Sequence, residues 1–255
     1  MKKKKYDLIF SIGAACSCTR SLRFSHLQNC SYPFDWLFGS DFQGRIDILI
    51  SEFKRYIEKD DLEDLNCTNN DEKNLCKVYY NKYNDITFNH DFPFDLSFED
   101  GYKIVKEKYN RRINRLLSNI NNAKNILLVY IETPDCKNKL SDDNILFEAS
   151  KKLKDKYPEK IFDILYFSQD FNFNHNEYKE VLKTNEITKI IGNYKGIWEN
   201  APSYEVDGDF FKKYLKRFSL NLPVSYKVKR FTQKLLINLI PNKAKRKELR
   251  IKYHF

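Results

Sequence analysis

The chain has 255 residues, of which 42% are hydrophobic, including 20 Phe and 17 Tyr, a composition that excludes a disordered protein. This length is enough for one large α/β domain or two small ones. No run approaches the roughly 18 apolar residues that span a membrane, which excludes an integral helical membrane protein.

The net charge of +10 is concentrated at one end of the chain. Residues 224–255 contain ten Lys or Arg and a single acid, Glu248, so the remainder is almost neutral. We therefore divide the chain into a body, residues 1–222, and a basic tail, residues 223–255. Basicity is a property of the tail and not of the predicted core.

The N-terminal stretch indicates a cytoplasmic protein. The opening MKKKK has the charge of a secretory signal, but DLIFSIGAAC follows with an acid and no clean cleavage site. In the cytoplasm the six cysteines, at positions 16, 18, 30, 67, 76 and 136, should be reduced. Cys16 and Cys18 are one residue too close for a Cys-x-x-Cys zinc motif, and no second close pair exists. We expect no metal and no cofactor.

Four short apolar runs alternate with helical patterns along the body. The runs cover residues 7–12, 125–131, 162–167 and 187–191, and the helical patterns cover 16–28, 101–120, 143–156 and 175–184. Alternation of this kind favours βαβ units, and so an α/β fold with an open, mostly parallel sheet flanked by helices. Residues 60–98 break the alternation, and we expect a β-hairpin or an irregular excursion there.

In open α/β sheets, ligands bind at the carboxyl ends of the strands. The polar residues at these ends are Ser11 to Cys16 with Gly13 at the turn, Glu132-Thr133, Ser168-Gln169-Asp170 and Gly192-Asn193. We expect them to converge on one edge of the sheet. Ser11 and Gly13 are the predicted substrate-binding residues of the first turn.

Cys16 is the candidate nucleophile of this edge. A thiol at the start of a helix faces unpaired backbone N–H groups and the positive end of the helix dipole, which both stabilise thiolate. The alternative is that Gly13-Ala14-Ala15-Cys16 is a run of small residues where helix and strand pack closely.

A cysteine nucleophile needs a base, which a third group orients. His90, in FNHDFPF, is the best placed of the four histidines, and the neighbouring Asp91 could bond a nearby group. In SYPFDWLFG, residues 31–39, Asp35 could orient a histidine and Trp36 could form a pocket wall. The alternatives are a buried histidine bonded to a backbone carbonyl and an aromatic plug with one hydrogen-bonded carboxylate.

An arginine cluster follows in NRRINR, residues 110–115. Arg111 and Arg115 lie four residues apart on one helical face, with Arg112 beside them. Such a group could bind a substrate carboxylate or phosphate in a bidentate manner, although a solvated basic face is the alternative.

These motifs together resemble a known family. DLIFSIGAAC, Leu22-Arg23, SYPFDWL, HDFP and RRINR are similar to the bacterial DUF1796 family, labelled as candidate papain-like cysteine peptidases. The resemblance implies Cys16 as nucleophile, His90 as base and Asp35 or Asp91 as the orienting acid. It also implies a papain-like α+β fold, an alternative to the parallel sheet that the periodicity favours.

The tail contains a predicted basic amphipathic helix. Val224, Val228, Phe231, Leu235 and Leu239 form one stripe over residues 224–240, beside Lys227, Arg230 and Lys234. This pattern is typical of a helix on an anionic membrane surface, here the inner face of the cytoplasmic membrane. The alternative is a helix docked on the protein's own core. Nucleic acid is not an expected partner, because no recognised binding module is present.

The sequence leaves three function classes open. The first is a cysteine peptidase or a related thiol hydrolase or acyl transferase, acting on a peptide, acyl or glycan substrate through Cys16 and His90. The second is a transferase or accessory protein of bacterial surface-polysaccharide synthesis with a structural Cys16. LIPNKAKRKELRIKY resembles the C-terminal ends of capsule and lipopolysaccharide glycosyltransferases. The third is a non-catalytic binding module held at the membrane by its tail.

Overall fold

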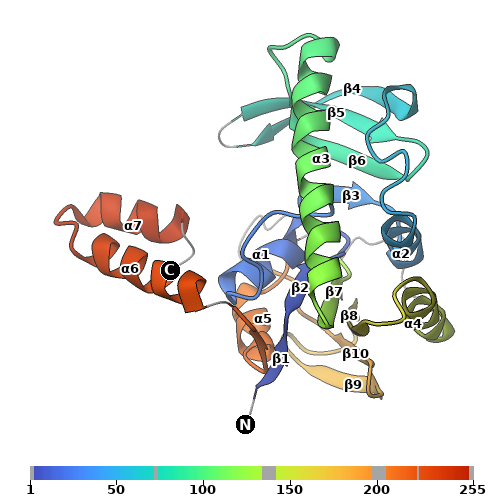
Figure 1. Cartoon of the computed structure of the whole chain (residues 1–255), viewed down its shortest axis with the longest axis vertical. Coiled ribbons are helices and arrows are strands. Elements are labelled where there is room, and N and C mark those ends of the chain that lie inside the picture. The colour runs from blue at the N-terminus through green and yellow to red at the C-terminus, as the bar shows by residue number, and fades with distance from the viewer. Residues whose placement is uncertain (1–2, 72–73, 134–141, 197–204, 223, 253–255) are drawn as a thin grey trace.

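The computed structural model describes residues 3–71, 74–133, 142–196, 205–222 and 224–252. Its centre is a five-stranded sheet in the order β2-β7-β8-β10-β9 (Figure 1). The parallel strands are β2 (Leu8–Ser11), β7 (Asn125–Ile131), β8 (Ile161–Gln169) and β10 (Ile187–Gly192). These are the four predicted apolar runs, and the α/β class is confirmed.

Helices cover both faces of this sheet because alternate strand residues point to opposite sides. Leu8, Phe10 and their equivalents on β7 and β8 pack in one core, and Ile9 and its equivalents pack in a second. The first core is covered by α2 (Phe42–Ile50), α3 (Phe98–Asn122) and α4 (Asn144–Lys156), and the second by α1 (Cys16–Phe24) and α5 (Gly208–Leu215). Burial on both faces explains why the strands read as continuous apolar runs.

The helix predicted over residues 175–184 is wrong. The chain there forms β9 (Tyr178–Lys183), an edge strand that pairs antiparallel with β10. Its side chains alternate between exposed and half-buried, with Glu180 and Leu182 on the inner side. Pairing with the open edge of β10 outweighs a weak helical pattern in so short a segment. Charged side chains on an edge strand also discourage further strand addition.

The segment between residues 60 and 98 forms most of a second sheet. Its strands are β4 (Leu62–Asp71), β5 (Asn74–Asn81) and β6 (Ile86–Pro93), and β3 (Leu37–Gly39) completes the antiparallel order β3-β6-β5-β4. A short 3₁₀ turn, Lys59–Asp61, precedes β4. The expected hairpin is therefore a four-stranded sheet that includes the end of the SYPFDWLFG motif.

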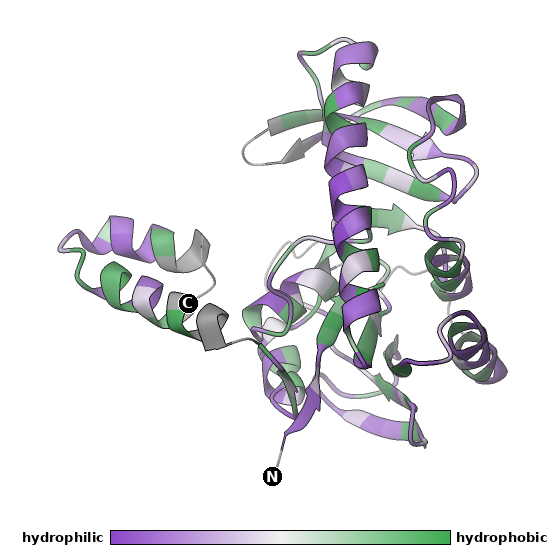
Figure 2. Ribbon diagram, in the orientation of Figure 1, coloured by the Kyte–Doolittle hydropathy of each residue, from purple (hydrophilic) through white to green (hydrophobic). Residues whose placement is uncertain are grey.

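The long helix α3 joins the two sheets. It starts at Ser97, whose side chain accepts a hydrogen bond from the backbone N–H of Asp100 and so caps the helix. In its first half the Tyr109 ring packs on Phe88 of β6, at 5.1 Å between centroids. In its second half Leu116 belongs to the core of the five-stranded sheet. Figure 2 shows the mainly hydrophilic side of α3 beside the hydrophobic strands.

The C-terminal residues leave the body as a helical hairpin. β1 (Lys4–Tyr6) pairs with β11 (Phe218–Leu220) at the margin of the body, and α6 (Val224–Asn238) and α7 (Lys243–Lys252) follow. The hairpin stands to one side of the two sheets (Figure 1). The helix expected over 224–240 is confirmed, whereas the boundary between 222 and 223 stays a prediction. None of the described helices has the length and apolar character needed to cross a bilayer.

The close packing of α1 on β7 requires glycine at position 13. A Cβ placed there would lie 2.5 Å from Cys18 Cβ, 2.8 Å from Cys18 Sγ and 3.2 Å from the backbone nitrogen of Ile131. We expect Gly13→Ala to lower the free energy of unfolding by about 1–3 kcal/mol, as overpacking of a core does. The matched control is Gly208→Ala at the exposed start of α5, where no heavy atom lies within 4 Å. Urea denaturation of both variants measures the difference, and equal unfolding midpoints would contradict this account.

Candidate functional site

The polar ends of three parallel strands form one hydrogen-bonded network. Glu132, directly after β7, is fully buried and accepts hydrogen bonds from the Tyr166 hydroxyl (2.6 Å), the Ser168 hydroxyl (2.8 Å) and the Gln169 backbone N–H (2.9 Å). Gln169 Nε2 in turn donates to Asn193 Oδ1 at 3.1 Å. Three of the four predicted strand ends, those of β7, β8 and β10, therefore meet at the carboxyl edge.

The turn after β2 leads directly into α1. The backbone N–H of Gly13 donates to the Ser11 hydroxyl (3.1 Å), and the N–H of Ala14 donates to the carbonyl of Ile131 (3.4 Å). These bonds fix the turn against the end of β7. Cys16 is then the first residue of α1, and Ala15 before it has no side chain that could cap the helix.

Arg45 of α2, which the sequence analysis missed, holds this turn from the other side. Its side chain is buried and donates to five backbone carbonyls, those of Gly13, Ala14, Leu37, Gly39 and Ser40. The turn before α1 is thereby tied to the loop around β3. A signal was present in the sequence, because Arg45 lies three residues after Phe42 and next to the apolar Ile46, a spacing that places a lone arginine on the apolar side of a helix.

The Cys16 thiol is buried, with 3% of the residue exposed. Burial is the main cause that raises its pKa to about 11; Arg20 opposes the rise, and the nearby Glu205 carboxylate adds to it. Arg20 and Glu205 form an ion pair beside the thiol, and burial also raises the pKa of Glu205. At neutral pH, Cys16 is therefore a neutral thiol.

Cys18 lies deeper in the same helix. Its Sγ donates to the Val129 carbonyl at 3.4 Å, and burial raises its pKa to about 12. Cys18 thus packs α1 against β7. Cys67 is exposed on β4, and Cys136 lies outside the described residues.

Asp35 is a buried hydrogen-bond acceptor that ties the SYPFDW loop to α1. Its carboxylate accepts from Thr19 Oγ1 (2.9 Å), Arg23 Nη2 (3.2 Å), Gln28 Nε2 (2.8 Å) and the backbone N–H of Tyr32 (3.0 Å). Burial raises the pKa of this carboxyl, and the donors oppose the rise. The donors that the structure gives Asp35 belong to α1 and its own loop.

Trp36 follows in a strained conformation. Its φ of +67° lies in the left-handed region, which is rare for a bulky residue, and the Arg23 guanidinium lies 5.5 Å from the centre of its ring. Strained residues concentrate at functional sites. The role of Trp36 in a pocket wall stays a prediction, and its left-handed backbone conformation is consistent with that role.

His90 and Asp91 lie in a bulge of β6. Lys77 of β5 pairs with Phe92 and Tyr79 pairs with Phe88, so residues 89–91 of β6 lie opposite Val78 alone. Such bulges re-aim side chains and are frequent beside active sites. Because of this bulge, the side chains of His90 and Asp91 have different surroundings although the residues are adjacent in the chain.

The two side chains have different partners. His90 Nδ1 lies 3.0 Å from Asn69 Nδ2 of β4, and Asn69 also donates to the Asn89 carbonyl at 3.2 Å. Asp91 accepts from the Tyr109 hydroxyl of α3 at 2.9 Å and pairs with Lys108 at 2.5 Å. Asn69 escaped the sequence analysis because it lies two strands away from His90 in the sheet.

The arginines of α3 differ in burial. Arg111 is exposed, whereas Arg112 is half-buried and its guanidinium carbon lies 5.2 Å from the centre of the Tyr109 ring. Arg112 Nη1 is buried and has no hydrogen-bond partner among the described residues. Arg115 donates to the Ser31 carbonyl at 2.9 Å. Within the described part of the cluster, Arg112 thus has a buried donor that no protein group satisfies.

The predicted residues thus fall in two groups. Cys16, Ser11, Gly13, Asp35 and Trp36 belong to the β2–α1 turn and the loop behind it. His90, Asp91, Arg111 and Arg112 belong to β6 and α3, and α3 spans both sheets. Within the residues that the structure describes, no group of three or more His, Cys, Asp or Glu could hold a metal ion.

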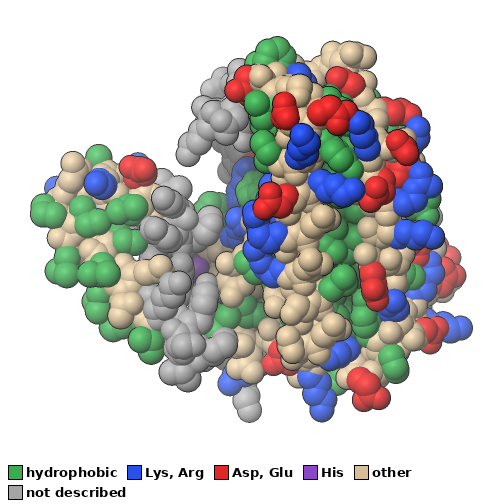
Figure 3. Space-filling model, turned by 45° about the horizontal axis from the view of Figure 1, so that its top comes forward, with side chains coloured by type: hydrophobic (Ala, Val, Ile, Leu, Met, Phe, Trp, Pro, Cys, Tyr) green, Lys and Arg blue, Asp and Glu red, His purple; other side chains and the backbone are tan. Residues whose placement is uncertain are grey.

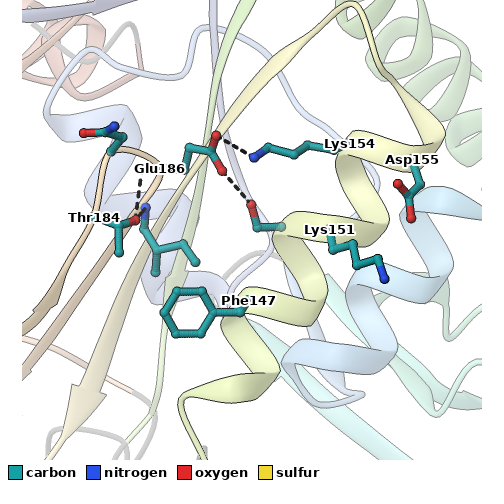
Figure 4. Close-up of a pocket in the computed structure, with 9 residues that line it drawn as sticks. Phe147, Lys151, Lys154, Asp155, Thr184 and Glu186 are labelled. Atoms are coloured by element: carbon teal, nitrogen blue, oxygen red, sulfur yellow. Dashed lines mark hydrogen bonds and ion pairs between the residues drawn. The ribbon is translucent and has the colours of Figure 1, made fainter.

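A separate hollow of about 440 Å³ opens at the opposite end of the parallel strands (Figure 4). It lies between the C-terminal half of α4 and the residues that precede β10. Glu186 there accepts from Ser150 Oγ (2.9 Å) and pairs with Lys154 (2.7 Å). Because Ile187 starts β10, this hollow lies at the amino ends of the strands and away from Cys16.

The raised pKa of Cys16 predicts how the thiol reacts. Since thiolate is the form that is alkylated, the rate at Cys16 should rise about tenfold per pH unit up to about pH 11. Peptide-level mass spectrometry of the folded protein treated with iodoacetamide measures this rate. The exposed Cys67 serves as the internal control and should be labelled faster at neutral pH. An inflection at Cys16 below the free-thiol value of about 8.5 would contradict the prediction.

One family model matches the chain, over residues 7–183, with the description "Putative papain-like cysteine peptidase (DUF1796)". It includes the β2–α1 turn, the SYPFDW loop, the β6 bulge and the arginines of α3. No curated protein and no solved structure matches. The family match covers well over half of the chain, so the chain belongs to the DUF1796 family.

Proposed function

We propose that this protein is a thiol-dependent hydrolase or acyl transferase of the papain-like cysteine peptidase type, with Cys16 as nucleophile. The proposal depends chiefly on one observation, that Cys16 is the first residue of α1 at the carboxyl end of β2. The first backbone N–H groups of a helix have no acceptor within it, so those of Cys16 and Ser17 could donate to a developing oxyanion. The family description supports the same chemistry.

The neutral thiol determines the kind of mechanism. With a pKa of about 11, Cys16 does not exist as a preformed thiolate at neutral pH, so a base must take its proton during attack. His90 is the base in this proposal. The Asn69 amide N–H donates to Nδ1, so this hydrogen bond has to open before Nδ1 can take the thiol proton. Asp91 is engaged by Lys108 and Tyr109, and Asp35 by α1, so both act as positioning residues.

The proposed reaction has two steps. Cys16 Sγ attacks the carbonyl carbon while His90 takes the thiol proton, and the bond to the leaving amine or alcohol breaks as His90 returns that proton to it. The product is a thioester on Cys16. Water, or an acceptor nucleophile, then attacks the thioester and gives a proton through His90 to the released sulfur. No oxidant, reductant or metal takes part.

A stoichiometric acyl-enzyme is the expected sign of this chemistry. With p-nitrophenyl acetate we expect a burst of one nitrophenolate per chain and one acetyl group on the Cys16 peptide, detected by mass spectrometry. Cys16→Ala should abolish both. His90→Gln should slow the burst by about 10²- to 10⁴-fold, as loss of a general base does.

Two matched variants make this experiment decisive. Cys67→Ala removes an exposed thiol and His175→Gln removes a histidine that pairs with Asp207, and neither should change the burst. Circular dichroism establishes that each variant is folded. If the acetyl group stays in folded Cys16→Ala, or if His175→Gln and His90→Gln have equal effects, the proposal is wrong.

A second candidate is a transferase or accessory protein of surface-polysaccharide synthesis in which Cys16 is structural. Two observations favour it: the Cys16 thiol is buried with a raised pKa, and Arg112 Nη1 is a buried donor with no partner among the described residues. A guanidinium with a free donor is suited to a phosphate group. In this proposal the ligand is a nucleoside diphosphate sugar.

The two candidates predict different effects at Arg112. For the second, Arg112→Gln should weaken binding of uridine diphosphate, as measured by calorimetry, by about 10- to 150-fold, the loss of one charge-assisted hydrogen bond. The matched control is Arg111→Gln on the exposed side of the same helix, which should have little effect. Cys16→Ser should leave this binding intact. Absence of binding to the unmodified protein would reject the second candidate.

A further inference from the structure

The α6–α7 hairpin exposes a stripe of large apolar side chains. Val228, Phe231, Leu235 and Leu239 are 55%, 63%, 47% and 76% exposed, and Leu236 beside them is 64% exposed. At about 100° per residue, the first three lie on one side of α6, and Leu239, which follows the helix and donates to the Leu235 carbonyl, extends the stripe to roughly 80° of arc. The side chain of Val224, the fifth member of the predicted stripe, lies outside the described residues.

The stripe lies on the opposite side of α6 from its buried residue Ile237. Ile237 of α6 is only 5% exposed, and it lies about 160° around the helix from Leu239. α6 contacts α7 in the hairpin. The stripe is therefore on the solvent side of α6. Figure 3 shows hydrophobic side chains gathered over this lobe, whereas charges of both signs are mixed on the body.

The same hairpin carries the charge of the protein. Residues 224–252 contain ten Lys or Arg and one acid, out of a net charge of +10 for the whole chain. On α7 the side chains of Lys243, Lys245 and Lys247 are exposed. α6 is 15 residues long, about 22 Å, which is too short to cross a bilayer. An exposed apolar stripe with flanking cations suits a helix lying in the headgroup region.

We infer that the α6–α7 hairpin docks the protein on an anionic lipid surface. Phe231, Leu235 and Leu239 insert among the acyl chains near the headgroups, and the exposed lysines of α7 lie against the lipid phosphates. Neither the apolar insertion nor the lysine attraction is sufficient for stable binding alone. The apolar stripe is short, and each lysine contributes only a salt-sensitive attraction. This inference does not depend on the chemistry proposed for Cys16.

Charge and shape argue against other occupants of the stripe. A second copy of the hairpin would bring two strongly basic surfaces together, which disfavours self-association. A nucleic acid would neutralise the lysines but would leave the apolar stripe in water. The body is almost neutral overall, so net charge does not draw the hairpin onto it.

Vesicle flotation of the full chain tests the inference. Phosphatidylcholine vesicles containing about a quarter phosphatidylglycerol should bind the protein, and phosphatidylcholine alone should not. The variant with Lys243, Lys245 and Lys247 changed to Gln should bind about a hundredfold more weakly, about fivefold for each charge. Matched changes at Lys54, Lys212 and Lys213, exposed lysines of the body, should have little effect.

The apolar stripe has its own matched pair. Phe231→Ser with Leu235→Ser should weaken binding at least tenfold, and Leu236→Ser, which lies about 100° from Leu235, should weaken it less. Unchanged thermal unfolding of the double variant supports the inference, and a lowered melting temperature would show instead that the stripe docks on the body. Equal binding to both kinds of vesicle, or a dimer that dissociates in the double variant, would overturn it.

Discussion

The convergence of five backbone carbonyls on the Arg45 guanidinium organises the candidate site. Buried carbonyls need donors, and one side chain of α2 supplies them to the turn before α1 and to the loop around β3. The β2–α1 turn is held on its other side by the Ile131 carbonyl. The start of α1, and so the position of Cys16, follows from these two anchors.

Helix α3 imposes the second constraint. Its buried residues contribute to a single hydrophobic core that includes residues of both sheets. Through Tyr109 and Lys108 it holds Asp91, and through Arg115 it contacts the SYPFDW loop. α3 is thus the physical connection between the Cys16 side and the His90 side of the predicted site.

The environment of Cys16 decides which thiol chemistry is open to it. The helix N-terminus and Arg20 favour thiolate, but burial and Glu205 outweigh them and leave the pKa at about 11. A preformed thiolate–imidazolium pair is therefore not the resting state, and deprotonation has to accompany attack. The proposed mechanism therefore needs a base beside Cys16, whereas a cysteine that only packs in the core needs none.

The sequence determined the parallel strands, because fully buried strands produce continuous apolar runs that no solvated element shares. It also determined the helix of the tail and the residue types of the candidate site, through local spacing and turn residues. The failure over residues 175–184 has a local cause, since a short amphipathic segment has no strong preference until an open strand edge is beside it.

Only the tertiary structure decided how these parts meet. The bond between His90 and Asn69 depends on a bulge opposite Val78, and the five acceptors of Arg45 come from two separate loops. The raised pKa of Cys16 depends on burial by residues far away in the chain, and Glu205 is one of its neighbours. Spacing along a sequence records local periodicity, whereas burial and hydrogen-bond partners arise only when distant segments pack together.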